Sequence, residues 1–120
     1  MKIAMPVEIK SMESNVCKSF GRAPYFLIYD TESKESVFLE NSATKSQGGA
    51  GIRAAQIILD NKANALLTPQ CGENAAEVFR AANVKIYKAN NGPVTENIND
   101  FNSGKISLLD DIHPGFHNHS

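Results

Sequence analysis

A glycine-rich stretch at residues 46–56 carries the clearest sign of chemistry in the chain. Its sequence, SQGGAGIRAAQ, places Gly48, Gly49 and Gly51 directly before residues with helical spacing. Glycine lets the backbone turn tightly, and a helix that starts there presents free N–H groups and the positive end of its dipole. Arg53 adds a cation in the first turn, so the stretch predicts an anion-binding site. The alternative is a plain glycine turn that joins a strand to a helix.

Other loops can extend this site. Arg22 follows Gly21 in an earlier segment, and Gly72 precedes a second run of helical spacing that begins at Asn74. A cation from another loop and a second glycine at a helix start both suit an anion. Asn74 and Gln47 are weaker candidates, as amide donors beside each glycine turn. The alternative for the arginines is a solvated surface charge.

Soft metal ligands are few. Cys17 and Cys71 are the two cysteines of the chain, so a disulfide framework is excluded and both thiols are expected to stay free. Thiolates bind iron or copper, whereas free cysteines usually pack as small apolar side chains. Both interpretations stay open for these two residues.

All three histidines, His113, His117 and His119, lie in the polar, proline-broken C-terminal tail. Their spacing is that of a flexible chelator for nickel, zinc or copper. The alternative is an end of the chain that is merely polar. The sequence does not decide between the two.

The composition is that of one ordinary globular domain. The chain has 120 residues, of which 42% are hydrophobic and 21% charged, and its net charge is -1. That charge disfavours a nucleic-acid-binding surface. No apolar run approaches the length of a membrane span, and the apolar start is too short for a signal peptide. We therefore expect a cytoplasmic protein, a monomer or weak homodimer, with no nucleic-acid or membrane partner.

The elements that must position these residues alternate between strands and helices. The second and third strands share a short turn and predict an antiparallel hairpin, while the uniformly apolar fourth strand is typical of a buried parallel strand. The fifth strand alternates apolar and charged residues, as an edge strand does. Strands are predicted at 3–7, 24–30, 36–41, 65–68 and 84–88, helices at 52–59, 74–82 and 94–102, a domain over 1–109 and a flexible tail at 110–120.

Five strings follow one another along the chain: SFGRAPYF at 19–26, EN at 40–41, GGAGI at 48–52, GENA at 72–75 and VKIY at 84–87. Taken in order, they resemble the dinitrogenase iron-molybdenum cofactor biosynthesis family, which includes nitrogenase accessory factors. The resemblance implies an α/β fold with three α/β/α layers, a ribonuclease H-like motif and a mixed five-stranded sheet without a ribonuclease active site. The first strand offers no carboxylate before Glu8, which separately argues against a two-metal nuclease.

The resemblance also implies a function. Family members bind or carry iron-molybdenum-sulfur cofactors or their precursors, and one relative binds a mixed molybdenum-copper sulfide cluster. For this chain it implies a non-catalytic carrier of an iron-sulfur or molybdenum-containing sulfide cluster, working with a protein that donates or accepts the cluster. The residues that we assign to such a cargo come from the interpretation of turns, charges and soft ligands given above. They are Arg22, Gly48, Gly49, Gly51, Arg53 and Gly72 as the cradle, and Cys71, Cys17, His113, His117 and His119 as metal ligands.

Two positions depart from the family's pattern. Many relatives have a histidine before the Phe-Gly pair, where this chain has Ser19, with Cys17 two residues earlier. Relatives commonly carry an aliphatic residue before the second glycine turn, where this chain has Cys71. The sheet order that the family implies places the two cysteine-containing loops after adjacent strands, so that they can approach each other.

Two other functions stay open. The glycine turns also suit a phosphate-bearing small molecule, which the protein would bind as a regulator or an enzyme. The sequence shows no nucleophile paired with a base, because histidine is confined to the tail, so we predict that the protein is not an enzyme. A protein-interaction module would instead use the edge strand at 84–88.

Overall fold

The structure, a computed structural model, describes residues 1–45 and 48–109. It confirms the five predicted strands and three helices, and adds a short 3-10 helix, η1, that the sequence did not predict. Among the described helices, none is long and apolar enough to cross a membrane. The elements are β1 (Lys2–Val7), β2 (Tyr25–Asp30), β3 (Ser36–Glu40), η1 (Ser42–Lys45), α1 (Ala50–Asp60), β4 (Ala65–Thr68), α2 (Glu73–Ala81), β5 (Lys85–Lys88) and α3 (Val94–Asn102).

The strands form one mixed sheet in the order β3-β2-β1-β4-β5. β1, β4 and β5 are parallel, whereas β2 is antiparallel to both of its neighbours, β1 and β3. Because two antiparallel steps separate β3 from β1, these two strands point the same way. β1, β3 and β4 therefore end at the same edge of the sheet, which we call the carboxyl edge.

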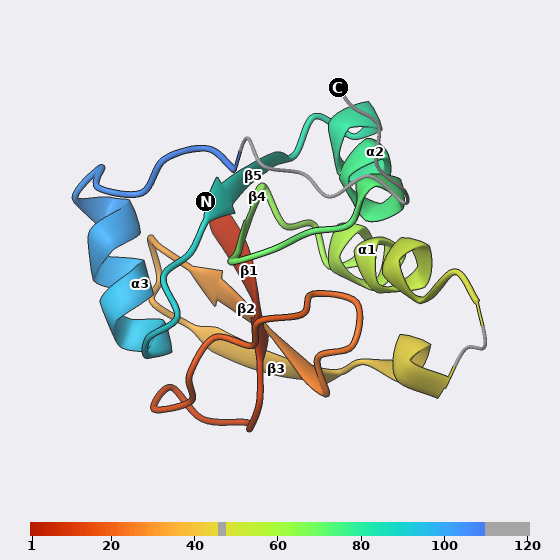
Figure 1. Ribbon diagram of the computed structural model, residues 1–120. Coiled ribbons are helices and arrows are strands. Elements are labelled where there is room, and N and C mark those ends of the chain that lie inside the picture. Colours follow the sequence, from red (N-terminus) through yellow and green to blue (C-terminus); the bar gives the residue numbers. More distant parts are fainter. Residues whose placement is uncertain (46–47, 110–120) are drawn as a thin grey trace.

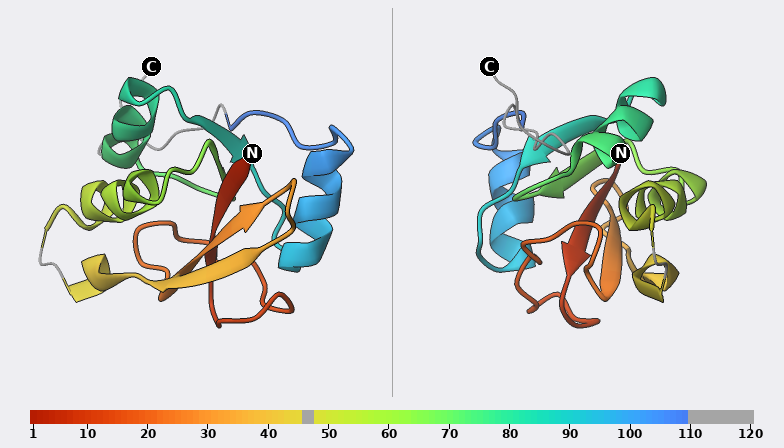
Figure 2. Two further views of the ribbon diagram at one scale, coloured as in Figure 1. Left: turned by 180° about the vertical axis from the view of Figure 1, so that it is seen from behind. Right: turned by 45° about the vertical axis from the view of Figure 1, so that its right-hand side comes forward.

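Helices cover both faces of the sheet, with α1 and α2 on one side and α3 on the other (Figures 1 and 2). Successive strand residues alternate between the two faces, as the pleat requires, and each face has its own apolar cluster. The cluster under α1 and α2 joins strand residues Ala4, Phe26 and Leu66 to helix residues Ala55, Ile58 and Phe79. The cluster under α3 joins strand residues Ile3, Met5 and Leu27 to helix residues Val94 and Ile98. The three-layer α/β/α arrangement is thus confirmed.

The outer edge of β5 is covered by the segment that follows α3. The Lys88 N–H donates to the Ser107 carbonyl at 2.8 Å, and the Leu109 N–H donates to the Ile86 carbonyl at 2.8 Å. An added strand would need these same backbone groups. These bonds argue against the alternative function, an interaction module that would pair a partner strand with the edge at 84–88.

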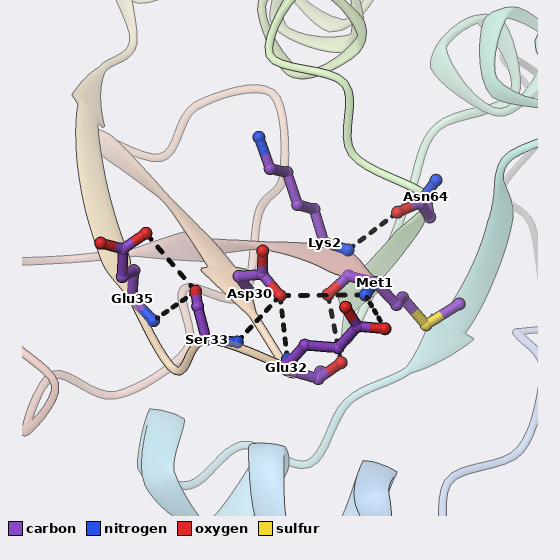
Figure 3. A network of polar contacts seen from close by, with 8 residues as sticks. Met1, Lys2, Asp30, Glu32, Ser33, Glu35 and Asn64 are labelled. Atoms are coloured by element: carbon purple, nitrogen blue, oxygen red, sulfur yellow. Dashed lines mark hydrogen bonds and ion pairs between the residues drawn. The ribbon is translucent and has the colours of Figure 1, made fainter.

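At the end of the sheet opposite the carboxyl edge, a network of polar contacts ties the start of β1 to the β2–β3 turn and to the residue before β4 (Figure 3). The Lys2 N–H donates to Asn64 Oδ1 at 2.8 Å. The Glu32 N–H donates to Asp30 Oδ1 at 2.9 Å, and this bond lowers the pKa of Asp30 below its ordinary value. The network closes the end of the sheet that lies away from the carboxyl edge.

Candidate functional site

A cleft of about 390 Å³ opens at the carboxyl edge of the sheet. Three segments line it: residues 20–22 from the loop after β1, residues 49–52 at the start of α1, and residues 72–75 at the start of α2. In open α/β sheets ligands bind outside the carboxyl ends of the strands. The position of the cleft therefore marks it as the candidate binding site.

The starts of two helices meet at this cleft. Gly49 caps α1 and Gly72 caps α2, and neither helix has a side-chain cap within the described residues. The first bonds inside the helices run from the Arg53 N–H to Gly49 and from the Ala76 N–H to Gly72, both at 3.0 Å. The N–H groups of residues 50–52 and 73–75 thus lack an acceptor in the described part of the chain, and each helix adds a partial positive charge.

The walls of the cleft lie close together, and one of its glycines has a backbone conformation that is unusual for other residues. Gly49 has a φ of 69°, in the left-handed region that side chains disfavour. A Cβ at Gly21 would lie 3.4 Å from Gly51 Cα, and a Cβ at Gly51 would lie 3.5 Å from Ala75 Cβ. The loop after β1 therefore packs against the α1 backbone, which in turn packs against α2.

The cleft carries one formal charge of each sign. Arg22 and Glu73 both line it and are both exposed. Within the described residues neither takes part in an ion pair. Glu73 lies in the first turn of α2, where the dipole stabilises a carboxylate. Since the two side-chain charges balance, the helix starts give the cleft its net positive character. Glu73 is a lining residue that the sequence analysis did not single out.

Four of the six predicted cradle residues line the cleft: Arg22, Gly49, Gly51 and Gly72. Gly48 is exposed beside it and is not a lining residue. The lesser candidate Asn74 does line the cleft, whereas Gln47 falls outside the described residues.

The structure separates Arg53 from Arg22. Arg53 lines a different hollow of about 230 Å³, together with Gln56 and Asp60 on the same helix. Residues three or four positions apart lie on the same face of a helix, so Arg53 shares one face of α1 with Gln56 and Asp60. The two arginines therefore do not form one cradle.

The two cysteines lie in loops that follow adjacent strands, β1 and β4, as the resemblance implied. Cys71 is buried, its Sγ lies 3.6 Å from the Gly72 carbonyl oxygen, and burial raises the pKa of its thiol to about 11. Cys17 is half-buried and packs against the same apolar cluster as Cys71. A ligand role for either cysteine stays a prediction.

A multidentate metal site is not found in the described part of the chain. Residues 1–45 and 48–109 contain no group of three histidine, cysteine or carboxylate side chains that would hold an ion. His113, His117 and His119 lie outside the described residues. What the described cleft offers is a set of hydrogen-bond donors.

Phe20 anchors the loop that brings Arg22 to the cleft. Its ring lies 5.2 Å from that of Phe26 and 5.6 Å from that of Phe79, between centroids, and it is 3% exposed. The same residue lines the cleft. The sequence analysis did not assign Phe20 to the site, although its place before Gly21 was the available signal.

Comparisons with known proteins agree with this fold. An uncharacterized protein from Methanocaldococcus jannaschii is 31% identical over 113 residues, which cover 92% of each chain. The apo form of the orange protein from Desulfovibrio gigas is 28% identical, with a TM-score of 0.87, and the match covers 91% of this chain and 92% of that one. An NMR structure of a Thermotoga protein is 33% identical, with a TM-score of 0.81 over 99% and 98% of the two chains. Residues 1–104, which include every residue of the cleft, match a family described as dinitrogenase iron-molybdenum cofactor, and the chain belongs to that family.

Proposed function

We propose that this protein is a non-catalytic carrier that binds an anionic metal-sulfur cluster, of the iron-molybdenum type or a precursor of it, in the cleft at the carboxyl edge. The observation that carries the proposal is the meeting of two uncapped helix starts and Arg22 at one cleft. Sulfide and oxo groups at the surface of such a cluster accept hydrogen bonds from N–H donors and attract a guanidinium. Membership of the family and the likeness to the apo orange protein support this class of cargo.

The lining of the cleft favours binding over catalysis. Its side chains include one carboxylate, one amide and one guanidinium, and among the described lining residues there is no serine, cysteine, histidine or lysine. A covalent mechanism needs a nucleophile and a base within hydrogen-bonding reach of each other. The cleft therefore supports a carrier that passes its cargo to an acceptor protein.

Hydrogen bonds and charge would bind the cargo in the first step, before any thiolate coordinates it. The raised pKa of Cys71 keeps its thiol protonated at neutral pH, and coordination to a metal requires loss of that proton. Coordination by Cys71 or Cys17 would then be a second step. A Cys71→Ser variant distinguishes the two modes, because it removes a metal ligand and leaves the cleft donors in place.

The test is anaerobic titration of the purified protein with tetrathiomolybdate, followed by desalting and measurement of the retained visible absorption. Arg22→Ala should weaken binding about tenfold or more, since hydrogen bonds to charged groups contribute about 1.5–3 kcal/mol. Glu73→Gln should strengthen it by about two- to fivefold, because a carboxylate at a helix start competes with the ligand. Arg53→Ala is the matched control, because it removes the same charge from the separate hollow.

Two outcomes would count against the proposal. Equal losses in Arg22→Ala and Arg53→Ala would mean that net charge, and not the cleft, attracts the ligand. A wild-type protein that retains no absorption after desalting would end the cluster-carrier interpretation.

The same donors define the second candidate function, binding of a phosphate-bearing small molecule. Helix starts also bind phosphate groups, and none of the described lining residues is a soft metal ligand. A thermal shift with nucleotides or sugar phosphates, together with no retention of tetrathiomolybdate, would establish this function in place of the first.

A further inference from the structure

Behind the cleft, one buried asparagine holds the loop that carries Arg22. Asn41 follows β3 and is 3% exposed. Its Nδ2 donates to the Gly21 carbonyl at 3.2 Å and to the Ala23 carbonyl at 2.8 Å. The carbonyls on both sides of Arg22 are thus bound by a single side-chain amide.

The orientation of this amide is fixed by its remaining contacts. Asn41 Oδ1 accepts from the Ala43 N–H at 3.1 Å, and the Asn41 N–H donates to the Pro24 carbonyl at 3.0 Å. The Asn41 carbonyl accepts from both the N–H and the hydroxyl of Thr44. Because each polar group of Asn41 has a partner, the amide cannot turn over without leaving a buried group unpaired.

The hydrogen bonds of Asn41 also set the direction of the Arg22 N–H. In a planar trans peptide the carbonyl and the following N–H point to opposite sides. Since the Gly21 carbonyl points to Asn41, the Arg22 N–H points away from it, and that N–H has no acceptor in the described part of the chain. Gly21 and Arg22 line the cleft, whereas Asn41 does not.

The loop is also limited from the other side. The Gly21 backbone lies against the start of α1, where an added Cβ would be 3.4 Å from Gly51 Cα. The loop therefore lies between the Asn41 amide and the α1 backbone, so the amide determines where the Arg22 backbone lies relative to the helix starts.

We propose that Asn41 is a positioning residue for the cleft: it aims the Arg22 N–H at the anion as a further donor and keeps the guanidinium beside the two helix starts. This inference rests on the proposed function, because it names a residue that prepares the same site. Asn41 itself does not touch the ligand.

The chain offers a closely matched control in Asn97. Asn97 is fully buried on α3, against the opposite face of the sheet from α1 and α2. Its Nδ2 donates to the Asn90 carbonyl at 3.2 Å and the Pro93 carbonyl at 3.0 Å, and its Oδ1 accepts from the Asn90 N–H at 2.8 Å. Asn41→Ala and Asn97→Ala therefore delete the same side-chain hydrogen-bond set at two places.

The experiment compares wild type, Asn41→Ala and Asn97→Ala by four measurements. These are the urea unfolding midpoint, hydrogen exchange of the Ala23 amide without ligand, the ligand-induced shift of the Arg22 amide resonance, and the dissociation constants of tetrathiomolybdate and inorganic phosphate. The Ala23 amide reports on the loop because its N–H donates to the Phe20 carbonyl at 3.4 Å. Both variants should lower the midpoint. Asn41→Ala alone should speed exchange at Ala23, abolish the ligand-induced shift of the Arg22 amide resonance, and weaken binding about tenfold, a coupling typical of residues in direct contact.

The failures are distinguishable. If Asn41→Ala binds as tightly as Asn97→Ala, or leaves exchange at Ala23 unchanged, Asn41 has a structural role alone and the proposed function stands. If the wild type binds neither tetrathiomolybdate nor phosphate, both proposals fall. Should Asn41→Ala not fold, Asn41→Ser and Asn97→Ser give the same comparison, because serine is too short to reach the two loop carbonyls.

Discussion

Alkaline pH should destabilise the protein through Cys71. Burial raises the pKa of this thiol to about 11 from the ordinary value of 9.0, and the positive charge of Arg80 offsets part of the rise. The unfolded chain therefore loses the proton at a lower pH than the folded chain. Above pH 9 the unfolded state binds fewer protons, so the stabilisation is complete below that pH and falls as pH rises toward 11.

The size of the effect follows from the shift. A shift of two units corresponds to about 2.7 kcal/mol when the titration is complete, and about 1.4 kcal/mol of this is lost by pH 10. Small domains are stable by about 5–15 kcal/mol, so the loss is large enough to measure by denaturant unfolding.

The assay is urea unfolding between about pH 8 and pH 10.5 of wild type and Cys71→Ala. Other groups titrate in this range, but they are common to both proteins and cancel in the difference. The stability advantage of wild type over Cys71→Ala should shrink by about 1.4 kcal/mol at pH 10. A difference that stays constant with pH would refute the reasoning and favour an accessible thiolate at position 71.

Two further predictions concern backbone and core. Gly49→Ala should lower the free energy of unfolding by about 1–2 kcal/mol, because Gly49 has a φ of 69°. Gly51→Ala should change the free energy of unfolding by less than about 1 kcal/mol, since the added Cβ makes an ordinary contact with Ala75. Equal losses in the two variants would contradict this prediction. Phe79→Ala should lower the free energy of unfolding by about 3–5 kcal/mol, because the side chain is fully buried. Val37→Ala, at a residue 52% exposed, should lower it by less than about 0.5 kcal/mol.

The sequence predicted the elements well because their signals are local. A run such as 65–68 is apolar throughout, and the structure buries all of it as β4, between two parallel neighbours. Helical spacing after a glycine likewise predicted α1 and α2, each of which begins directly after its glycine cap. Such patterns depend on residues a few positions apart, which a single sequence displays directly.

The errors concern relations between distant segments. Arg53 lies two residues after Gly51, and Arg22 directly after Gly21, yet the direction in which α1 runs places Arg53 at another hollow. The alternation at 84–88 correctly indicated an edge strand, but no local pattern shows that residues 107–109 pair with it. Asn41 gave no signal of its role, because its partners Gly21 and Ala23 lie in another loop.

The charge distribution indicates what kind of recognition this cleft can achieve. The chain carries a net charge of -1, and Arg22 is opposed by Glu73 at the cleft itself, so long-range attraction for an anion is weak. The N–H groups at the two helix starts, which have no acceptor in the described part of the chain, act at contact distance, and they are neutral donors held in place by the helices. A cargo with many acceptor atoms over its surface satisfies several of them at once, whereas a small anion of the same charge satisfies few. Recognition of this kind depends on the shape and acceptor spacing of the ligand more than on its charge, and this suits a carrier that must tell one bulky anion from the small anions around it.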